Sequence, residues 1–364
     1  MIAVAEGKKG KRGELLEGIQ ILRAVAALLV VLHHALEESL AAIPGPKSPD
    51  WLTTFGAAGV DIFFVISGFI MLYVSFPAGG PPASPRSFLF SRITRIYPLY
   101  WICLATLIAL KIVVRSSSLP GDPNVFLRSI LLLPDDYMIL GPAWTLVYEM
   151  YFYIIFAATL TFAKPLISLV ATTAAILILY TLANFAPDAA LREFLGDPIA
   201  FEFCLGLTLA TIYWRWPRLI VLGRPLWFFG FALLAIAPLM VNHVTTNSLP
   251  SPERLFAWGV PAFLIALSFL ALKFNRTRLQ RIALLCGDAS YAIYLTHPLV
   301  MVSYAKLLKG QLANFPQWPI IPFVIVISAG LGILVHVFVE RPVMASVRGL
   351  RLRVRNSVSR TGLP

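Results

Sequence analysis

Apolar stretches long enough to cross a bilayer recur along the whole chain, separated by short polar connections. A hydrocarbon core of about 30 Å needs roughly 17–25 helical residues, and inside it the backbone must bond to itself. The pattern therefore predicts an all-α, polytopic integral membrane protein with about ten transmembrane helices. A shorter apolar piece, 126–133, is too brief to cross and is expected to lie at the interface or to re-enter. The expected spans are 19–36, 56–76, 97–114, 143–162, 166–186, 199–214, 219–241, 256–272, 289–308 and 319–339.

The composition and the placement of basic residues agree with this interpretation. Of the 364 residues, 58% are hydrophobic and only 13% are charged, against about 25% charged in soluble domains. With the N-terminus in the cytoplasm, 21 of the 30 Lys and Arg residues fall on the cytoplasmic side and 7 on the outer side, as the positive-inside rule requires. Both termini are then cytoplasmic. The net charge of +12 reflects topology and contact with the lipid bilayer, so we expect no nucleic acid partner.

No fixed-period repeat, low-complexity linker or appended soluble domain interrupts the pattern. We expect one transmembrane domain, 19–342, between a basic cytoplasmic N-terminus, 1–18, and a basic cytoplasmic tail, 343–364. The three cysteines lie in apolar stretches, which predicts small core residues and neither a disulfide framework nor a zinc site.

The first apolar stretch carries an ionisable group near each end. Arg23 and His34 are eleven residues apart, so at about 1.5 Å and about 100° per residue they share one helix face and lie roughly 16 Å from each other. Ionisable groups at this depth are costly and are a functional hypothesis by default. The alternative is a packing histidine and an arginine that snorkels to the interface.

Two carboxylates lie inside later spans. Asp61 is five residues from the outer end of the second span, and Glu149 is six residues from the outer end of the fourth. Both are therefore expected at the level of His34 in the outer half of the bilayer. There, a carboxylate would orient the imidazole as a general base. The alternative is a buried structural ion pair.

Two arginines mark the expected inner mouth of the third span. Arg92 and Arg95 are three residues apart and share a helix face near a helix start, which suits a phosphate because guanidinium groups bind phosphate oxygens in pairs. The alternative is ordinary positive-inside charge. In the second span, Ser67 and Gly68 allow close approach of either a ligand or another helix.

Further polar positions have weaker signals. His297 precedes Pro298 in the ninth span, where we expect a helix break, and is either a second catalytic or substrate-contacting group or a hydrogen-bonded core histidine. Tyr97, Tyr100 and Trp101 are expected to form an aromatic belt at the membrane interface.

Seven short motifs, taken in order from 19 to about 342, resemble the integral-membrane acyltransferase family 3, in particular its exopolysaccharide O-acetyltransferase branch. The resemblance implies a bacterial inner-membrane enzyme that transfers an acyl group, usually acetyl, from cytoplasmic acyl-CoA to a carbohydrate hydroxyl. One small departure is Glu17-Gly18-Ile19-Gln20, where an acidic-Gly-Leu entry is common. The motifs are LRAVAALLVVLHH, GVDIFFVISGF, SRITRIYPLYW, AWTLVYEMYFY, FEFCLG, SYAIYLTHP and VERP.

The resemblance assigns roles residue by residue. The family's arginine-ten-histidine pattern falls on Arg23 and His34, so His34 and not His33 takes the catalytic role. Its Arg-x-x-Arg pattern, associated with the CoA donor, falls on the two arginines of the third span. The other matching positions are Ser67, Gly68 and Phe69 of a Ser-Gly-Phe motif, and Trp144 and Glu149 of a Trp-x-x-x-x-Glu motif.

The resulting hypothesis is an O-acyltransferase with acetyl-CoA as co-substrate and no metal. Arg92, Arg95 and Arg23 hold the phosphates, and the pantetheine arm runs along the Ser67–Gly68 face. His34, oriented by Asp61 or Glu149, deprotonates the sugar hydroxyl. An acyl-histidine relay is a variant that the sequence does not separate. Residues expected to contact substrate or to play a secondary part are Trp144, His297 and Tyr291.

The alternative from another class is a transporter or flippase of a lipid-linked saccharide. That reading predicts inverted repeats and paired broken helices around a midplane site. The sequence shows one candidate break, at Pro298, and no internal repeat.

Overall fold

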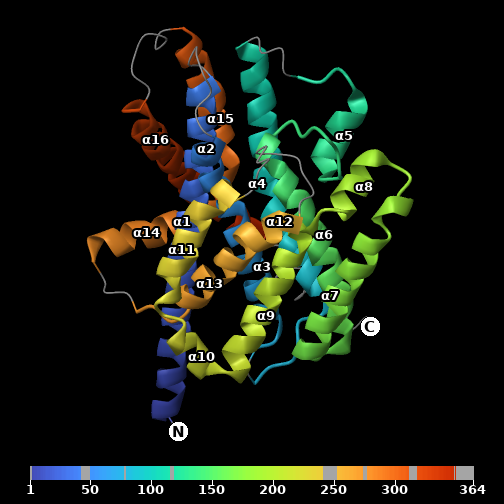
Figure 1. Cartoon of the computed structure of the whole chain (residues 1–364), viewed down its shortest axis with the longest axis vertical. Coiled ribbons are helices and arrows are strands. Elements are labelled where there is room, and N and C mark those ends of the chain that lie inside the picture. The colour runs from blue at the N-terminus through green and yellow to red at the C-terminus, as the bar shows by residue number, and fades with distance from the viewer. Residues whose placement is uncertain are drawn as a thin grey trace.

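A computed structural model describes residues 2–41, 50–77, 79–114, 119–240, 252–273, 277–310, 318–347 and 349. These residues form helices joined by turns, with no strand among them (Figure 1). Two π-helical turns, Leu255–Gly259 and His336–Glu340, adjoin α13 and α16. The helices are α1 (Ile2–Ala41), α2 (Asp50–Ala57), α3 (Gly59–Ser75), α4 (Pro85–Val113), α5 (Pro123–Leu131), α6 (Trp144–Thr159), α7 (Pro165–Thr181), α8 (Ala189–Leu195), α9 (Phe201–Arg215), α10 (Pro217–Leu222), α11 (Leu226–Met240), α12 (Pro252–Arg254), α13 (Val260–Phe269), α14 (Arg278–Asp288), α15 (Ser290–Lys309) and α16 (Ile320–Val335).

Helix α1 is the longest element and runs from the lower end of the view towards the upper part of the bundle (Figure 1). It packs against α2, α3, α14, α15 and α16, while α3 packs mainly against α9. Helix α4 contacts α6 and α15. The ionisable face of α1 therefore looks into the bundle, where five helices can place side chains opposite it.

Every expected span is helical where the structure describes it, but the number of ten is not confirmed. Five helical segments are long and apolar enough to cross a membrane, and a sixth is possible if α8 and α9, bent by 43°, form one span. The fifth and eighth expected spans are shorter apolar helices, and the seventh divides into α10 and α11. The five are Glu17–Ser39, Thr54–Ser75, Pro85–Val113, Gly141–Phe162 and Ile320–Val347.

The ends of the chain leave the topology a prediction. Side chains of residues 2–16 and all of 350–364 lie outside the described part of the structure. The cytoplasmic placement of both termini, and the domain limits at 18 and 342, therefore stay predictions. What the structure supports is the coarser statement that the protein is all-helical and multi-pass.

The short apolar segment is the helix α5, and α4 holds it at one end. Tyr97, Tyr100 and Trp101 donate hydrogen bonds to the carbonyl groups of Leu131, Ser129 and Ile130. These carbonyls belong to the last turn of α5, which lacks helical partners of its own. The three aromatic residues lie near the middle of α4, so α5 ends alongside that helix's midpoint. These hydrogen bonds hold α5 against α4, and the interfacial belt expected from sequence stays a prediction.

Helices α3 and α9 cross at two glycines. A Cβ on Gly68 would lie 2.0 Å from the carbonyl oxygen of Phe203, and one on Gly206 would lie 2.2 Å from that of Val65. The backbones are thus too close for any side chain. The prediction that Gly68 lines a ligand path is wrong, because it faces α9. Ser67, about 100° further round α3, faces the bundle interior.

Candidate active site

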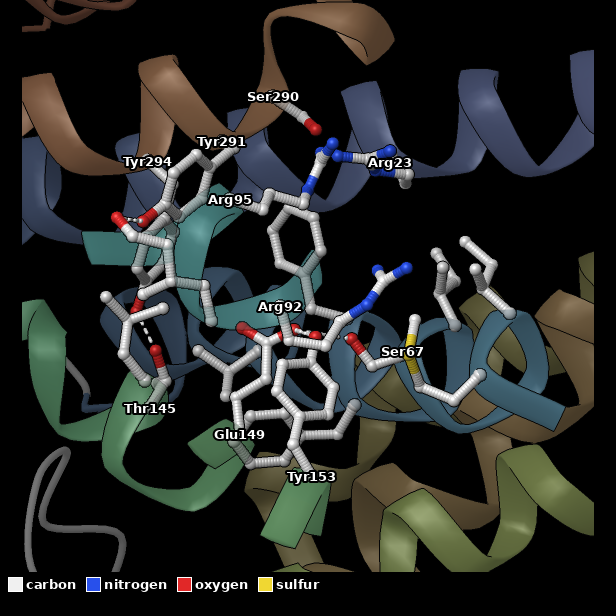
Figure 2. A pocket seen from close by; sticks show the side chains of 18 residues that line it. Arg23, Ser67, Arg92, Arg95, Thr145, Glu149, Tyr153, Ser290, Tyr291 and Tyr294 are labelled. Atoms are coloured by element: carbon white, nitrogen blue, oxygen red, sulfur yellow. Dashed lines mark hydrogen bonds between the residues drawn. The ribbon is translucent and has the colours of Figure 1, made fainter. Parts of the chain in front are cut away.

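Two cavities meet the middle of α1, and their linings differ. The first, which we call the arginine cavity, has an empty volume of about 940 Å³ and is lined by α1, α3, α4, α6 and α15 (Figure 2). Eight of its eighteen lining residues are apolar aliphatic or aromatic side chains. The other ten are Arg23, Ser67, Arg92, Arg95, Thr145, Glu149, Tyr153, Ser290, Tyr291 and Tyr294.

Three guanidinium groups converge on the arginine cavity. Arg92 and Arg95 come from one face of α4, and Arg23 reaches in from α1 (Figure 2). The Nε atom of Arg92 is buried and has no hydrogen-bond partner among the described residues. Three cations in one partly buried space repel one another, and an unmet N–H donor adds a further cost. The cavity is therefore built for an anion with several oxygen acceptors.

Glu149 belongs to the arginine cavity. Its Oε1 atom accepts a hydrogen bond of 3.0 Å from the Ser67 hydroxyl and a second from the Tyr153 hydroxyl. The carboxylate thus partly balances the three arginines. The expectation that Glu149 shares a site with His34 is wrong, because His34 lines the other cavity.

The second cavity, which we call the histidine cavity, has an empty volume of about 1480 Å³. His34 lines it from α1, opposite residues of the 134–148 and 190–197 segments and Arg254. Its charged and aromatic lining residues are His34, Asp135, Asp136, Tyr137, Trp144, Tyr148, Glu193, Phe194, Asp197 and Arg254.

A backbone carbonyl orients His34. Its Nδ1 atom lies 2.9 Å from the carbonyl oxygen of Val30, one turn earlier on α1. A carbonyl oxygen only accepts, so in the neutral ring Nδ1 carries the proton and Nε2 carries the lone pair. That tautomer is the one a general base needs. The orienting carboxylate expected from sequence is not observed among the described residues.

His297 lies beside His34. The two ring centroids are 5.0 Å apart, and His297 is fully buried on α15. His33, the other neighbour, has its ring centroid 4.8 Å from that of His34. The expected helix break at Pro298 does not occur, because α15 runs on to Lys309. The structure brings His297 to the site without making it a lining residue of either cavity.

Asp61 is engaged elsewhere. Arg254 donates to both of its oxygens, from Nε at 3.0 Å and from Nη2 at 2.9 Å. The guanidinium also lies 5.7 Å from the ring centroid of Trp144 and 5.0 Å from that of Trp258. For Asp61 the alternative reading, a buried ion pair, is therefore the correct one. Arg254 was missed in the sequence, although a basic residue on the outer side departs from the positive-inside pattern.

A hydrogen-bonded layer separates the cavities. The Tyr294 hydroxyl is 2.7 Å from the Thr145 hydroxyl and 2.7 Å from the carbonyl oxygen of Pro142. Tyr294 and Thr145 line the arginine cavity, whereas Pro142 and Trp144 line the histidine cavity. We call Tyr294, Thr145 and Pro142 the partition. Its hydrogen bonds link lining residues of the arginine cavity to a lining residue of the histidine cavity.

Tyr291 fixes α15 against α4. Its hydroxyl donates a 2.8 Å hydrogen bond to the carbonyl oxygen of Ile96, and its ring lines the arginine cavity.

On α1, His33, His34 and Glu37 offer three ligand atoms within 4.8 Å of one another, a set able to hold a metal ion. A nitrogen of His33 is also 3.9 Å from a Glu37 oxygen, which is ordinary i,i+4 spacing.

Comparison with known proteins gives the family. A family profile described as an acyltransferase domain matches residues 16–337, which includes both cavities. The chain belongs to acyltransferase family 3. It is an O-acyltransferase and a multi-pass membrane protein, and the transporter reading is set aside.

Several named proteins are similar to this acyltransferase. The exopolysaccharide production protein ExoZ of Rhizobium meliloti is 31% identical over 318 residues, covering 82% of this chain and 93% of that protein. Acyltransferase MdmB of Streptomyces mycarofaciens is 25% identical over 332 residues, covering 80% and 82%. The putative peptidoglycan O-acetyltransferase YrhL of Bacillus subtilis is 25% identical over 375 residues, covering 92% and 56%. No solved structure matches.

Proposed function

We propose that this enzyme transfers an acetyl group from acetyl-CoA, bound in the arginine cavity, to a carbohydrate hydroxyl that enters the histidine cavity. The observation that carries the proposal is the pair of cavities on opposite sides of one thin partition. Carbohydrate acceptors are supported by two relatives whose names concern exopolysaccharide production and peptidoglycan O-acetylation. We place the enzyme in the bacterial inner membrane, with the carbohydrate exported or at the cell surface.

The donor half follows from charge and reach. Acyl-CoA is a polyanion at its nucleotide end, and Arg23, Arg92 and Arg95 supply the matching guanidinium groups. Arg23 and His34 are eleven residues apart on α1, which is roughly 16 Å along the helix. An extended pantetheine arm is of similar length. The thioester then lies at the partition, next to Tyr294.

The chemical step uses the neutral imidazole of His34. Its Nε2 atom accepts the proton of the acceptor hydroxyl while Val30 holds Nδ1–H in place. The hydroxyl oxygen attacks the thioester carbonyl carbon, the C–S bond breaks, and the CoA thiolate takes the proton from the imidazolium. Ester and CoA–SH are the products, and His34 returns to its starting form. His297 acts as a positioning residue that supports the His34 ring from α15.

Two carboxylates take positions other than those expected from sequence. Glu149 positions the donor end by holding Ser67 and offsetting the charge of the arginines. Asp61 serves Arg254, whose side chain lies against Trp144 at the histidine cavity. Neither is assigned to the proton transfer. A covalent acetyl-histidine on His34 is the variant mechanism, and the test below separates it.

The test uses purified enzyme in lipid nanodiscs with acetyl-CoA labelled in the acetyl group. CoA release is followed with and without polysaccharide for wild type, His34→Gln and the matched control His33→Gln. We expect acceptor-dependent release that falls by about 10²–10⁴-fold in His34→Gln, the usual contribution of a general base, and persists in His33→Gln. Label bound to the protein without acceptor would favour the covalent variant. Equal activity of His34→Gln and wild type would overturn the proposal.

A further inference from the structure

The lining of the histidine cavity carries an excess of negative charge. Among the described residues, four carboxylates line it, Asp135, Asp136, Glu193 and Asp197, against a single guanidinium, that of Arg254. They come from two separate segments, 135–136 and 193–197. The arginine cavity has the reverse balance, with three guanidinium groups and one carboxylate.

Arg254, which lines this cavity, and Arg128, which contacts the lining residue Asp135, are both ion-paired. Arg254 already binds both oxygens of the fully buried Asp61. Arg128, beside the cavity, donates to Asp188 at 2.9 Å and lies 3.8 Å from Asp135. The hydrogen bond to Asp188 raises the pKa of Arg128 above its ordinary value. Arg128 thus partly offsets the charge of Asp135, whereas no ion pair among the described residues offsets the other three lining carboxylates.

Aromatic faces accompany the carboxylates. Tyr148 and Phe194 stack with ring centroids 4.3 Å apart, and Trp144 meets Tyr148 edge-on at 5.9 Å. A pyranose ring has apolar C–H faces and a rim of hydroxyl donors. Aromatic rings can cover the C–H faces, and carboxylates can accept hydrogen bonds from the hydroxyl groups. The lining thus fits a polyhydroxylated ring, and the negative charge of the lining bears on which sugars can bind.

We propose that the histidine cavity selects its carbohydrate by charge: it admits a neutral or amino-bearing glycosyl residue and rejects a uronate or another anionic sugar. This inference rests on the proposed function and names the class of acceptor. A carboxylate on the sugar would lie among four like charges, which is an arrangement that specific sites use to exclude wrong ligands.

The size of the effect follows from Coulomb's law. Two like charges about 8 Å apart change a rate or binding constant by about 2-fold at the permittivity of bulk water and by about 30-fold at the effective permittivity of a protein surface, and about fivefold lies between these limits. Removing two of the four carboxylates should therefore reduce the discrimination by about 10–25-fold. Added salt should weaken the discrimination in the wild type, because exposed charges are screened beyond about 8–10 Å at physiological ionic strength.

The test compares three soluble oligosaccharides of equal length, one built on glucose, one on glucosamine and one on glucuronate. CoA release gives kcat/KM for each with wild type and with the double variant Asp136→Asn/Glu193→Gln. These two side chains make no hydrogen bond or ion pair among the described residues, whereas Asp135 and Asp197 bind Arg128 and the Ile199 amide. The control is Asp122→Asn, an exposed N-cap of α5 outside both cavities, where asparagine keeps the cap.

We expect wild type and the control to favour the glucose and glucosamine acceptors over the glucuronate one. The double variant should bring the ratio of glucose to glucuronate kcat/KM at least tenfold closer to one. Equal use of all three by wild type, or an unchanged ratio in the double variant, would overturn the inference and leave the proposed function standing. Absence of release with every acceptor would overturn both. Binding of the three sugars, measured by calorimetry with His34→Gln, must show the same order, which separates selection at the cavity from the chemical step.

Discussion

The two cavities share a helix and a partition but have opposite chemistry. The arginine cavity gathers cations around hydroxyl and phenol groups, and the histidine cavity gathers carboxylates around aromatic rings. One face of α1 serves both, with Arg23 in the first and His34 in the second. Under the proposed function, a polyanionic donor and a carbohydrate acceptor are sorted by electrostatics before either reaches the reacting atoms. The same carboxylates that favour an uncharged sugar would keep acyl-CoA out of the acceptor side.

Substitution of the two arginines of α4 should disrupt CoA binding and leave the histidine cavity intact. Arg92→Gln/Arg95→Gln should weaken CoA binding by roughly 100-fold or more, because each charge-assisted hydrogen bond contributes about 1.5–3 kcal/mol. Calorimetric titration of CoA checks this, and His34→Gln should bind CoA as wild type does. Arg86→Gln, an exposed arginine in the first turn of the same helix, is the control. Comparable weakening in Arg86→Gln would reduce the effect to general surface charge.

Gly68 packs against α9, whereas the adjacent Ser67 lines the arginine cavity, so substitutions at the two positions should have different effects. Gly68→Ala should lower the free energy of unfolding by about 1–3 kcal/mol, because its Cβ meets the carbonyl of Phe203. Ser67→Ala should leave stability nearly unchanged and raise KM for acetyl-CoA, because it frees Glu149 from a hydrogen bond. Thermal melts and donor KM values of the two variants check this. Reversed phenotypes would show that Gly68, not Ser67, faces the donor.

A smaller effect tests the partition. Tyr294→Phe removes two hydrogen bonds of 2.7 Å, and a hydroxyl bond contributes about 0.5–1.5 kcal/mol net. We expect hydrolysis of acetyl-CoA without acceptor to rise by a few-fold, as water gains access to the thioester. The control is Tyr304→Phe. Tyr304 lies on α15, as Tyr294 does, but lines neither cavity, and its replacement removes a 2.7 Å hydrogen bond to Ser39 of α1. An unchanged hydrolysis rate would mean that the layer does not guard the thioester.

Removal of metal ions is expected to have no effect on the rate. His33, His34 and Glu37 form a set able to hold an ion, yet the proposed chemistry needs none. Prolonged dialysis against a chelator should leave kcat unchanged. A loss restored by a divalent cation would reassign His34 from base to ligand.

Spacing along a helix predicted some of the residues that lie together in the structure. Helical periodicity placed Arg23 and His34 on one face of α1, and the arginine pair of α4 on one face of that helix, because spacing along a helix fixes the face. The grouping of Arg23 with the α4 pair came from the hypothesis of a bound CoA and not from spacing. Depth counted from helix ends failed for Glu149. That count assumes straight helices beginning at one plane, whereas α6 passes from Trp144 at one cavity to Glu149 at the other.

Long-range partners were out of reach for another reason. Asp61 pairs with Arg254, 193 residues later, and no local pattern encodes that contact. Val30 orients His34 through its backbone, which every residue possesses, so side-chain chemistry carried no signal for it. Gly68 is adjacent to the lining residue Ser67 in sequence, yet the two point about 100° apart, and only the position of α9 decides which one packs.

A structure of His34→Gln in nanodiscs with acetyl-CoA bound would show directly on which side of the partition the donor lies. We expect the phosphates among Arg23, Arg92 and Arg95, and the thioester beside Tyr294, directed towards position 34. Phosphates in the histidine cavity, or a thioester pointing away from the partition, would contradict the division of the enzyme into a donor side and an acceptor side.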